Sequence, residues 1–348
     1  MTKISITGEA FNVLIEGEEN RPVLMLAHPL GANLHIWAPQ VPALRAHFRV
    51  LRYDARGHGA SVANEGPYSI EGLGRDALAI LDALAIPKVH WLGLSLGSIV
   101  GQWLLIHARE RIGRAVLAST AAQMAGPDLW NSRIRSARDA GMNGVAIAAA
   151  ERWFTKAFRD THPEKVETVM EMVRKTSLQG YVAGCAAIRD MDHREAIRSI
   201  TNKVLVIAGR HDPAAPPRMG TFVANAIEGA KFVTLEASHI SNIEDAANFT
   251  KTVIDFLTAP ESAGAKASRR PKSQVKRAQI KKIAARKSSR QQASTSKAPT
   301  KKASAKKLKT KRPAKKASLK KTSSRISLGK TPGKKTGASK KTTGRKRS

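Results

Sequence analysis

One serine of the sequence stands in a context that could make its hydroxyl a nucleophile. Ser95 is the middle residue of GLSLG at 93–97, with a glycine two positions away on each side. The pentapeptide ends the apolar run VHWLG and opens the helical pattern LGSIVGQWLLIHARE, so a tight turn between a strand and a helix is predicted. Such a turn strains the serine backbone, and side chains at Gly93 or Gly97 would collide with the adjoining strand and helix. The context therefore predicts that Ser95 is a catalytic nucleophile.

A serine hydroxyl is almost fully protonated at neutral pH, so it needs a base and a group that orients the base. The sequence has ten histidines, and their number alone identifies none of them. His239 lies in LEASHIS after the last predicted strand, and Asp212 lies in VLVIAGRHDP after the strand before it. This order predicts that His239 takes the proton of Ser95 and that Asp212 orients the imidazole. His211, beside Asp212, is the alternative base.

Acyl transfer through a serine also requires two N–H donors for the developing oxyanion. The backbone N–H of Leu96, directly after the nucleophile, is one candidate. The other is Leu30 in the loop HPLG, because Pro29 before it has no N–H. His28 in the same loop is expected to form structural hydrogen bonds rather than to carry a proton.

The remaining polar motifs predict no second chemistry. In RYDARGHGAS at 52–61, Asp54 and Arg56 are expected to pair with each other and to hold the loop. The sequence has no HExxH motif, no paired CxxC, no Walker-type phosphate loop and no GxGxxG after a strand. We therefore expect neither a metal nor a cofactor.

The elements that must position these residues alternate between strand and helix. Near-continuous apolar runs predict strands that are covered on both faces. The predicted strands are 4–7, 11–15, 23–27, 48–53, 89–93, 115–119, 204–208 and 232–235. The predicted helices are 69–86, 96–110, 218–228 and 241–257, the last with Ser241 and Glu244 at capping-box spacing. The alternation predicts an α/β fold with a doubly wound, mostly parallel sheet.

One interval interrupts this alternation. Residues 122–200 contain helical patterns but no convincing strand, so they are expected to form a helical cap between core segments 1–121 and 201–259. The aromatic residues of the interval are expected to form mainly the interior of the cap itself. They are Trp130, Trp153, Phe154 and Phe158.

Charge divides the chain at about residue 260. Residues 1–260 carry 28 Lys and Arg against 26 Asp and Glu, whereas residues 261–348 carry 32 Lys and Arg and a single acid, Glu261. The second segment has no Phe, Tyr or Trp and few large aliphatic residues, too few to offset the entropy of folding. Residues 260–348 are therefore predicted to be a disordered polybasic tail.

The composition also limits the cellular setting. Cys185 is the single cysteine, so an intramolecular disulfide is excluded. The N-terminus MTKISITGEA lacks the apolar core of a signal peptide, and no apolar run approaches the ~20 residues that a membrane helix needs. We expect a cytoplasmic protein with no transmembrane segment.

Several stretches carry a specific resemblance to a known family. The sequence resembles the α/β-hydrolase superfamily, and within it the 3-oxoadipate enol-lactonases of bacterial aromatic catabolism. The matching stretches are HPLGANLHIW, FRVLRYDARGHGAS, PYSIEGLGRDALAILDAL, GLSLGSIVGQW, ERWFTKAF, GYVAGCAAIRDMDHRE and IAGRHDPAAPP, which span most of residues 10–257. The resemblance implies an α/β-hydrolase fold with Ser95, Asp212 and His239 at the catalytic positions, and Leu30 and Leu96 as the oxyanion donors.

The same resemblance implies a reaction in the β-ketoadipate pathway, the opening of 3-oxoadipate enol-lactone to 3-oxoadipate. An enolate is a better leaving group than an alkoxide, so a modest oxyanion hole should suffice. The substrate carries a free carboxylate, for which Arg133 and Trp153 in the cap are candidate partners. Arg189 is expected instead to brace the junction between cap and core.

Alternatives to this activity remain open at the level of sequence. The same residues could serve a generic carboxylesterase or lactonase, or a cofactor-free hydrolase resembling haloperoxidases. The tail at 261–348 predicts salt-sensitive, sequence-independent binding of DNA, RNA or another polyanion, including anionic membranes or granule surfaces. Alternatively, residues 261–348 are a solvated linker with no binding function. A non-enzymatic alternative is a basic nucleic-acid-binding protein that uses a hydrolase fold as a carrier.

Overall fold

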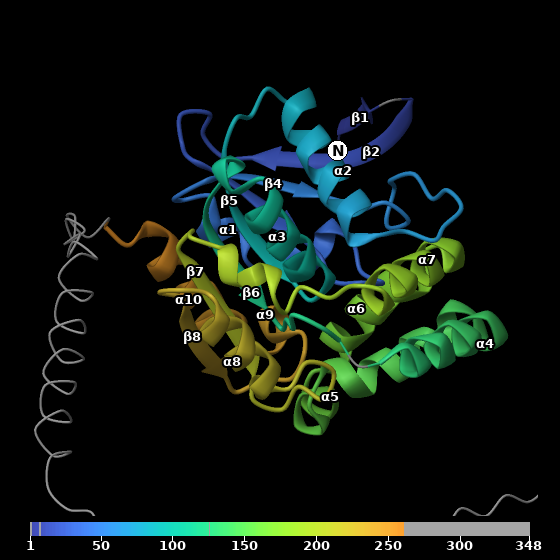
Figure 1. Cartoon of the computed structure of the whole chain (residues 1–348). Helices are drawn as coiled ribbons and strands as arrows, with labels where there is room; N and C mark the ends of the chain where they lie inside the picture. The colour runs from blue at the N-terminus through green and yellow to red at the C-terminus, as the bar shows by residue number, and fades with distance from the viewer. Residues whose placement is uncertain (1, 7, 125, 261–348) are drawn as a thin grey trace, which may run out of the picture. The chain divides into compact units, whose positions relative to one another are not determined.

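The computed structural model describes residues 2–6, 8–124 and 126–260, which contain one eight-stranded sheet with helices packed around it (Figure 1). The strands lie in the order β1-β2-β4-β3-β5-β6-β7-β8. The pairs β1–β2 and β2–β4 are antiparallel, and all other neighbours are parallel. The bounds are β1 Thr2–Ile6, β2 Glu9–Glu16, β3 Val23–Ala27, β4 Arg49–Tyr53, β5 Val89–Leu94, β6 Ile112–Ala118, β7 Val204–Gly209 and β8 Lys231–Leu235.

The central strands are apolar along their length because both faces of the sheet are covered. Every residue of β7 is buried, and so are all but one residue in each of β3, β5 and β6. All eight predicted strands are confirmed, with small shifts of their ends. The largest shift is at β6, which begins three residues earlier than predicted. Its Arg114 is buried and donates to the carbonyls of Phe256 and Leu257, so the strand includes a charged residue that hides its start.

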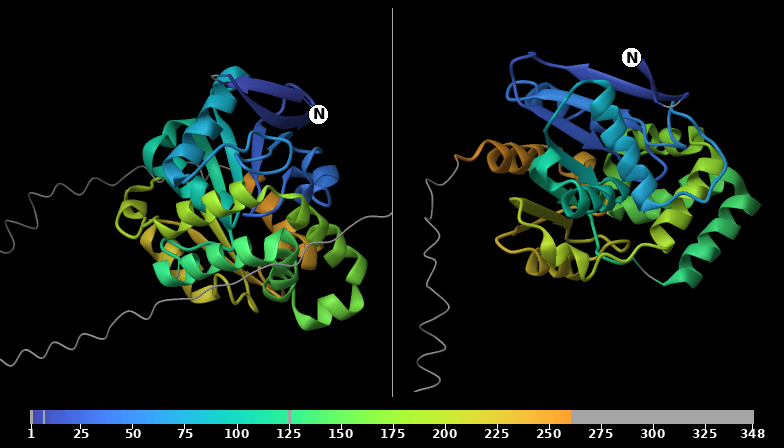
Figure 2. Two further views of the ribbon diagram at one scale, coloured as in Figure 1. Left: turned by 90° about the vertical axis from the view of Figure 1, so that its right-hand side faces the viewer. Right: turned by 45° about the horizontal axis from the view of Figure 1, so that its top comes forward.

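Helices from the parts of the chain before and after the helical interval 122–200 surround this sheet. α3 contacts β3, β5 and β6, α2 packs on α3, and α8 contacts β7 and β8. The two further views show the hairpin β1–β2 at one end of the sheet and β7–β8 at the other (Figure 2). The bounds are α1 Val41–Leu44, α2 Ile70–Ala83, α3 Leu96–His107, α8 Pro217–Ala226, α9 Ser241–Glu244 and α10 Ala246–Thr258, with 3₁₀ helices η1 Leu34–Trp37, η2 Arg109–Arg111 and η3 Ala196–Ser199.

The prediction of one continuous helix over 241–257 is wrong, because the segment forms two helices. Asp245 has φ −124° and ψ 55° and separates α9 from α10. The predicted capping box is also wrong, because the Ser241 hydroxyl is buried without a hydrogen-bond partner among the described residues. Glu244 instead binds groups outside its own helix. A capping box satisfies local N–H groups, and here a tertiary contact takes the carboxylate.

The interval between β6 and β7 is helical, as predicted. It holds α4 Pro127–Trp153, α5 Lys156–Thr161, α6 Pro163–Lys175 and α7 Leu178–Arg189, which lie together beside the sheet (Figure 1). We call these four helices the cap. α4 packs on α6 and α7 and is interrupted at Gly141, whose φ of 64° is non-helical. The division of the chain into core 1–121 and 201–259 and cap 122–200 stays a prediction.

The predicted disorder and polyanion binding of residues 261–348 concern a segment that lies outside the residues described by the structure. Within the described part of the chain, no helix combines the length and apolar character needed to cross a membrane.

Candidate active site

Ser95 lies in a strained turn between β5 and α3. Its φ of 54° and ψ of −112° are rare for a residue with a side chain, and its N–H donates to Ala118 O at 2.9 Å. A Cβ atom on Gly93 would lie 2.3 Å from Gly97 O, and a Cβ on Gly97 would lie 2.1 Å from Ala27 O. The predicted reason for both glycines is therefore confirmed, and the turn presents the Ser95 hydroxyl at the end of the strand.

Asp212 and His239 follow β7 and β8 and meet beside that turn. His239 Nδ1 and Asp212 Oδ2 are 2.7 Å apart, and both residues are buried. The other carboxylate oxygen accepts the N–H groups of Ala214 and Ala215 at 2.8 and 2.9 Å. Burial alone would raise the pKa of Asp212, but the attraction and hydrogen bond of His239, with the two N–H donors, hold it below its usual value. An ionised Asp212 fixes the proton of the imidazole on Nδ1 and leaves Nε2 free to accept another.

Ser95 and His239 line the same cavity, of about 40 Å³, together with Leu30. Parallel strands end at one edge of a sheet, so β3, β5 and β8 bring these three residues together from distant parts of the chain. Among the described residues, Ser95 Oγ has no direct hydrogen bond to His239. Catalytic hydrogen bonds are often long before substrate binds and shorten in the complex. The arrangement can perform nucleophilic acyl transfer once the two side chains share a proton.

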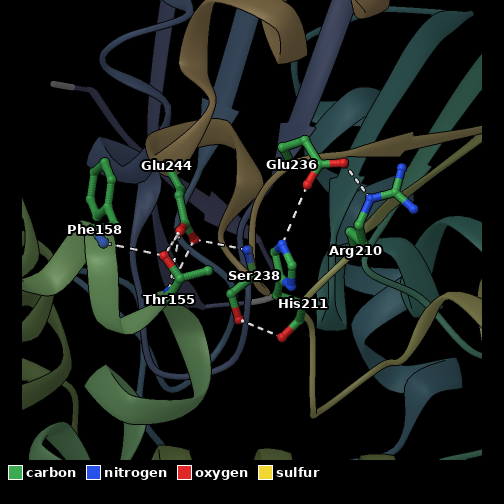
Figure 3. Close-up of polar contacts among 7 residues, drawn as sticks. All are labelled: Thr155, Phe158, Arg210, His211, Glu236, Ser238 and Glu244. Atoms are coloured by element: carbon green, nitrogen blue, oxygen red, sulfur yellow. Dashed lines mark hydrogen bonds and ion pairs between the residues drawn. The ribbon is translucent and has the colours of Figure 1, made fainter.

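His211, the alternative base, lies elsewhere. Its side chain is half exposed, and its Nε2 is 3.3 Å from Glu236 Oε2 on the surface (Figure 3). His211 does not line the cavity of Ser95. The structure thus gives His239 the contact with Asp212 and gives His211 a surface contact with Glu236.

Of the two predicted oxyanion donors, Leu96 follows Ser95 in the chain and Leu30 lines the same cavity as Ser95. Leu96 is the first residue of α3, so its N–H has no carbonyl to bond within the helix. The N–H of Leu30 has no partner within the described part of the chain, whereas the next N–H, of Gly31, donates to His58 Nε2 at 3.0 Å. The bond to Gly31 fixes the loop and leaves the Leu30 donor free.

Two buried histidines support this loop. His28 Nε2 accepts the N–H of Ala55 at 2.9 Å, which confirms the structural role predicted for His28. Burial, with the nearby ring of His28, lowers the pKa of His58 to about 3, and burial also lowers the pKa of His28. Both rings must stay neutral to accept these bonds.

The predicted pair of Asp54 and Arg56 is wrong. Asp54 accepts from Asn12 Nδ2 at 2.7 Å and from backbone N–H groups, including that of Leu34 at 2.8 Å. Arg56 instead forms a bidentate pair with Asp76, at 2.6 and 2.8 Å, and an ion pair with Glu9. Asp54 and Arg56 lie two positions apart in the loop, and each binds partners from other elements.

The cap covers the cavity with two aromatic and two cationic side chains. Trp130, Arg133, Arg152 and Trp153 of α4 all line it. The Trp153 ring lies 6.5 Å from the His239 ring, and Arg133 lies over Trp130 at 4.4 Å. Trp130 and Trp153 are buried as part of the cap interior, as predicted, but they also face the site.

Neither arginine of the cavity has a counter-ion in the part of the chain that the structure describes. Within residues 2–6, 8–124 and 126–260, no carboxylate forms an ion pair with Arg133 or Arg152. Burial, and then the like charge of Arg133, lower the pKa of Arg152. The buried indole N–H of Trp130 has no hydrogen-bond partner among the described residues either. The cavity therefore presents two cations, a combination that favours an anionic ligand.

The sequence predicts Arg133 and Trp153 as substrate contacts. It does not predict that Arg152 and Trp130 also line the cavity. Arg152 cannot be recognised from the sequence because α4 contains several arginines, and the sequence pattern does not show which of them point toward the cavity. The sequence predicts Trp130 as part of the cap interior. Its spacing of three residues from Arg133 places both on one helix face, and this was the available signal.

The role predicted for Arg189 is wrong. Arg189 donates to Asn131 Oδ1 at 2.9 Å and pairs with Asp190. Asn131 belongs to α4 and Arg189 to α7, so the contact joins two cap helices rather than cap and core.

In the described part of the chain, no three His, Cys, Asp or Glu side chains gather as metal ligands would.

Fold and site together define the class of the protein. Residues 22–246 match the family described as alpha/beta hydrolase fold, and the chain belongs to this family. It is 39% identical over 244 residues to 3-oxoadipate enol-lactonase 2 of Acinetobacter baylyi, covering 70% of this chain and 91% of that protein. It is 34% identical to 3-oxoadipate enol-lactonase 1 of the same organism, over 72% of this chain and 94% of that protein.

A solved structure agrees with these relatives. The crystal structure of the enol-lactonase from Burkholderia xenovorans matches with a TM-score of 0.73 at 44% identity, covering 74% of this chain and 100% of that one. The resemblance stated from the sequence is thus confirmed. The protein is a hydrolase related to the 3-oxoadipate enol-lactonases.

Proposed function

We propose that the protein hydrolyses 3-oxoadipate enol-lactone to 3-oxoadipate, a step of bacterial aromatic catabolism. Ser95 is the nucleophile, His239 the general base and Asp212 the residue that orients His239. The relatives named enol-lactonases support the substrate, at 34% to 44% identity. One observation of this chain carries the proposal: Ser95 and His239 share a cavity with Arg133 and Arg152, neither of which has a counter-ion among the described residues.

The proposed reaction proceeds through an acyl-enzyme. His239 Nε2 takes the proton of Ser95 Oγ while Oγ attacks the lactone carbonyl carbon, and Asp212 stabilises the imidazolium that forms. The N–H groups of Leu30 and Leu96 stabilise the oxyanion. The ring C–O bond then breaks, and the enol oxygen leaves and receives the proton. Water, activated by His239, hydrolyses the ester on Ser95, and the enol product tautomerises to the ketone.

The cap supplies the contacts that make the enol-lactone a better substrate than a simple ester. The carboxylate of the lactone is the anion that Arg133 and Arg152 lack. Trp153, beside His239, supplies an apolar wall for the ring. The arginine named from the sequence thus acts as one of a pair.

A small substrate panel tests the proposal. The enol-lactone, an uncharged aryl acetate and an uncharged simple lactone are compared by kcat/KM. We expect the enol-lactone to be preferred by at least about 100-fold, the value of a carboxylate pairing with two partly buried cations. A preference for the aryl acetate contradicts the specific assignment and makes the protein a generic esterase.

Two further predictions from the sequence stay predictions. The composition of 261–348 supports polyanion binding as a property added to hydrolysis, and the test is salt-dependent binding of duplex DNA by the full chain. A cytoplasmic location and a cofactor-free reaction are expected on sequence grounds alone.

A further inference from the structure

One carboxylate joins the loop of His239 to the cap. Glu244 Oε2 accepts the N–H of Ser238 at 2.8 Å, and Oε1 accepts the N–H of Thr155 at 3.2 Å and also its hydroxyl (Figure 3). Ser238 directly precedes His239. Thr155 ends the link between α4 and α5 and caps α5 by accepting the N–H of Phe158. A single side chain therefore bonds to the neighbour of the proposed base and to the cap.

Two more hydrogen bonds run along the same junction. Ser238 Oγ donates to Arg152 O at 3.0 Å, and the N–H of Ile240 donates to Trp153 O at 3.1 Å. Residues 152–155 are thus bonded to both chain neighbours of His239 and to Glu244. Arg152 and Trp153 are the residues of this segment that line the cavity.

His239 itself has other supports. Its ring is held by Asp212 at 2.7 Å, and its carbonyl accepts the Ser119 hydroxyl at 2.7 Å. The imidazole therefore keeps its place if the bonds of Glu244 are lost.

The end of α4 is attached to the loop of His239 by the bonds of Glu244 to Thr155 and Ser238 and by the two bonds to the carbonyls of Arg152 and Trp153. Loss of the Glu244 bonds therefore removes one of these attachments and loosens the segment that carries Arg152 and Trp153.

We propose that Glu244 is a positioning residue that sets Arg152 and Trp153 at a fixed place relative to His239. This rests on the proposed function, since it assumes that the cavity is the site of hydrolysis. Its consequence is selective. Loss of the Glu244 bonds weakens recognition of a substrate that carries a carboxylate, which needs Arg152, and spares an uncharged ester, which needs only the residues at the strand ends.

The test uses the full chain and two aryl esters of equal length, para-nitrophenyl hemisuccinate, which carries a carboxylate, and para-nitrophenyl butyrate, which does not. Glu244→Gln keeps the shape of the side chain but turns one acceptor into an NH₂ group that faces N–H donors. We expect KM for the hemisuccinate to rise about 10-fold, the loss of one charge-assisted hydrogen bond, while kcat/KM for the butyrate stays within about twofold.

Two matched variants serve as controls. Glu236→Gln changes a carboxylate nearby in sequence that binds Arg210 and His211 on the surface and does not reach the cap, so neither ester should be affected. Thr155→Ser keeps the hydroxyl that Glu244 accepts and should behave as wild type, whereas Thr155→Val should reproduce the selective rise in KM.

The outcomes separate the two proposals. Equal losses for both esters in Glu244→Gln, or no change for either, overturn the positioning role. Failure of the wild type to open the enol-lactone overturns the proposed function but leaves the comparison of the two esters valid. Retained thermal unfolding temperature in each variant shows that the kinetic changes do not come from partial unfolding.

Discussion

The strand-end loops of the core and helix α4 of the cap face one cavity but are built differently. In the core, each reactive group is held by backbone geometry or by a buried bond: the φ of Ser95 is 54°, and His239 lies 2.7 Å from Asp212. In the cap, Arg133 and Arg152 face the cavity with no counter-ion among the described residues. Under the proposed function, the core carries a general reaction and the cap carries the electrostatic selection of substrate.

The largest effect should come from the core. Ser95→Ala removes the nucleophile, and we expect kcat/KM to fall about 10⁴-fold or more for charged and uncharged esters alike. Ser69→Ala, a change at the N-cap of α2, is the matched control and should leave both rates unchanged. Substantial hydrolysis by the Ser95 variant would contradict the acyl-enzyme mechanism.

A smaller and selective effect should come from the cap. Arg152→Met removes one of the two cations, and we expect kcat/KM for para-nitrophenyl hemisuccinate to fall about 10- to 100-fold, with para-nitrophenyl butyrate little changed. Arg135→Met, an exposed arginine of the same helix outside this cavity, should change neither. An equal loss of activity toward both esters in the Arg152 variant would contradict the proposal that the cap selects charged substrates while the core carries out hydrolysis.

The core should also be the acid-sensitive region. The pKa of His58 is about 3 in the folded protein against 6.5 for a free histidine, so below pH 6.5 the unfolded chain binds a proton that the folded one does not. Stability should therefore be lost as pH falls from 6.5 toward 3, by up to about 1.4 kcal/mol per pH unit for this group.

The measurement is the free energy of unfolding in urea near pH 7 and near pH 5. His58→Asn keeps an acceptor for the Gly31 N–H but does not titrate, so its loss of stability between the two values should be smaller than that of the wild type. His47→Asn, at an exposed histidine, is the control and should follow the wild type. Equal slopes for His58→Asn and wild type would contradict this role.

The smallest effect on hydrolysis should come from outside both regions. Removing residues 261–348 takes away 32 cationic residues, and we expect kcat/KM to stay unchanged while DNA binding is lost. Fluorescence anisotropy with duplex DNA at several salt concentrations measures the binding, and full-length Ser95→Ala should bind as wild type. Loss of hydrolysis on truncation would show that the tail and the enzyme do not act separately.

Local patterns predicted much of the fold because their physical cause is local. The central parallel strands β3, β5, β6 and β7 are apolar on both faces, so their sequences predict them, except that Arg114 conceals the start of β6. The break at Asp245 and the partner of Glu244 were missed for the opposite reason. The bond from Glu244 to Thr155 spans 89 positions, and no pattern within one helix contains it.

The sequence by itself determined the glycine-flanked turn at Ser95 and the order in which Asp212 and His239 follow their strands. These depend on short-range sterics and on the rule that parallel strands end at one edge of a sheet. Only the tertiary structure decided that Arg152 and Trp130 face the cavity and that Glu244 joins the cap to the loop of His239. The physical reason is that the orientation of a helix face and the partner of a carboxylate are fixed by packing between segments far apart in the chain.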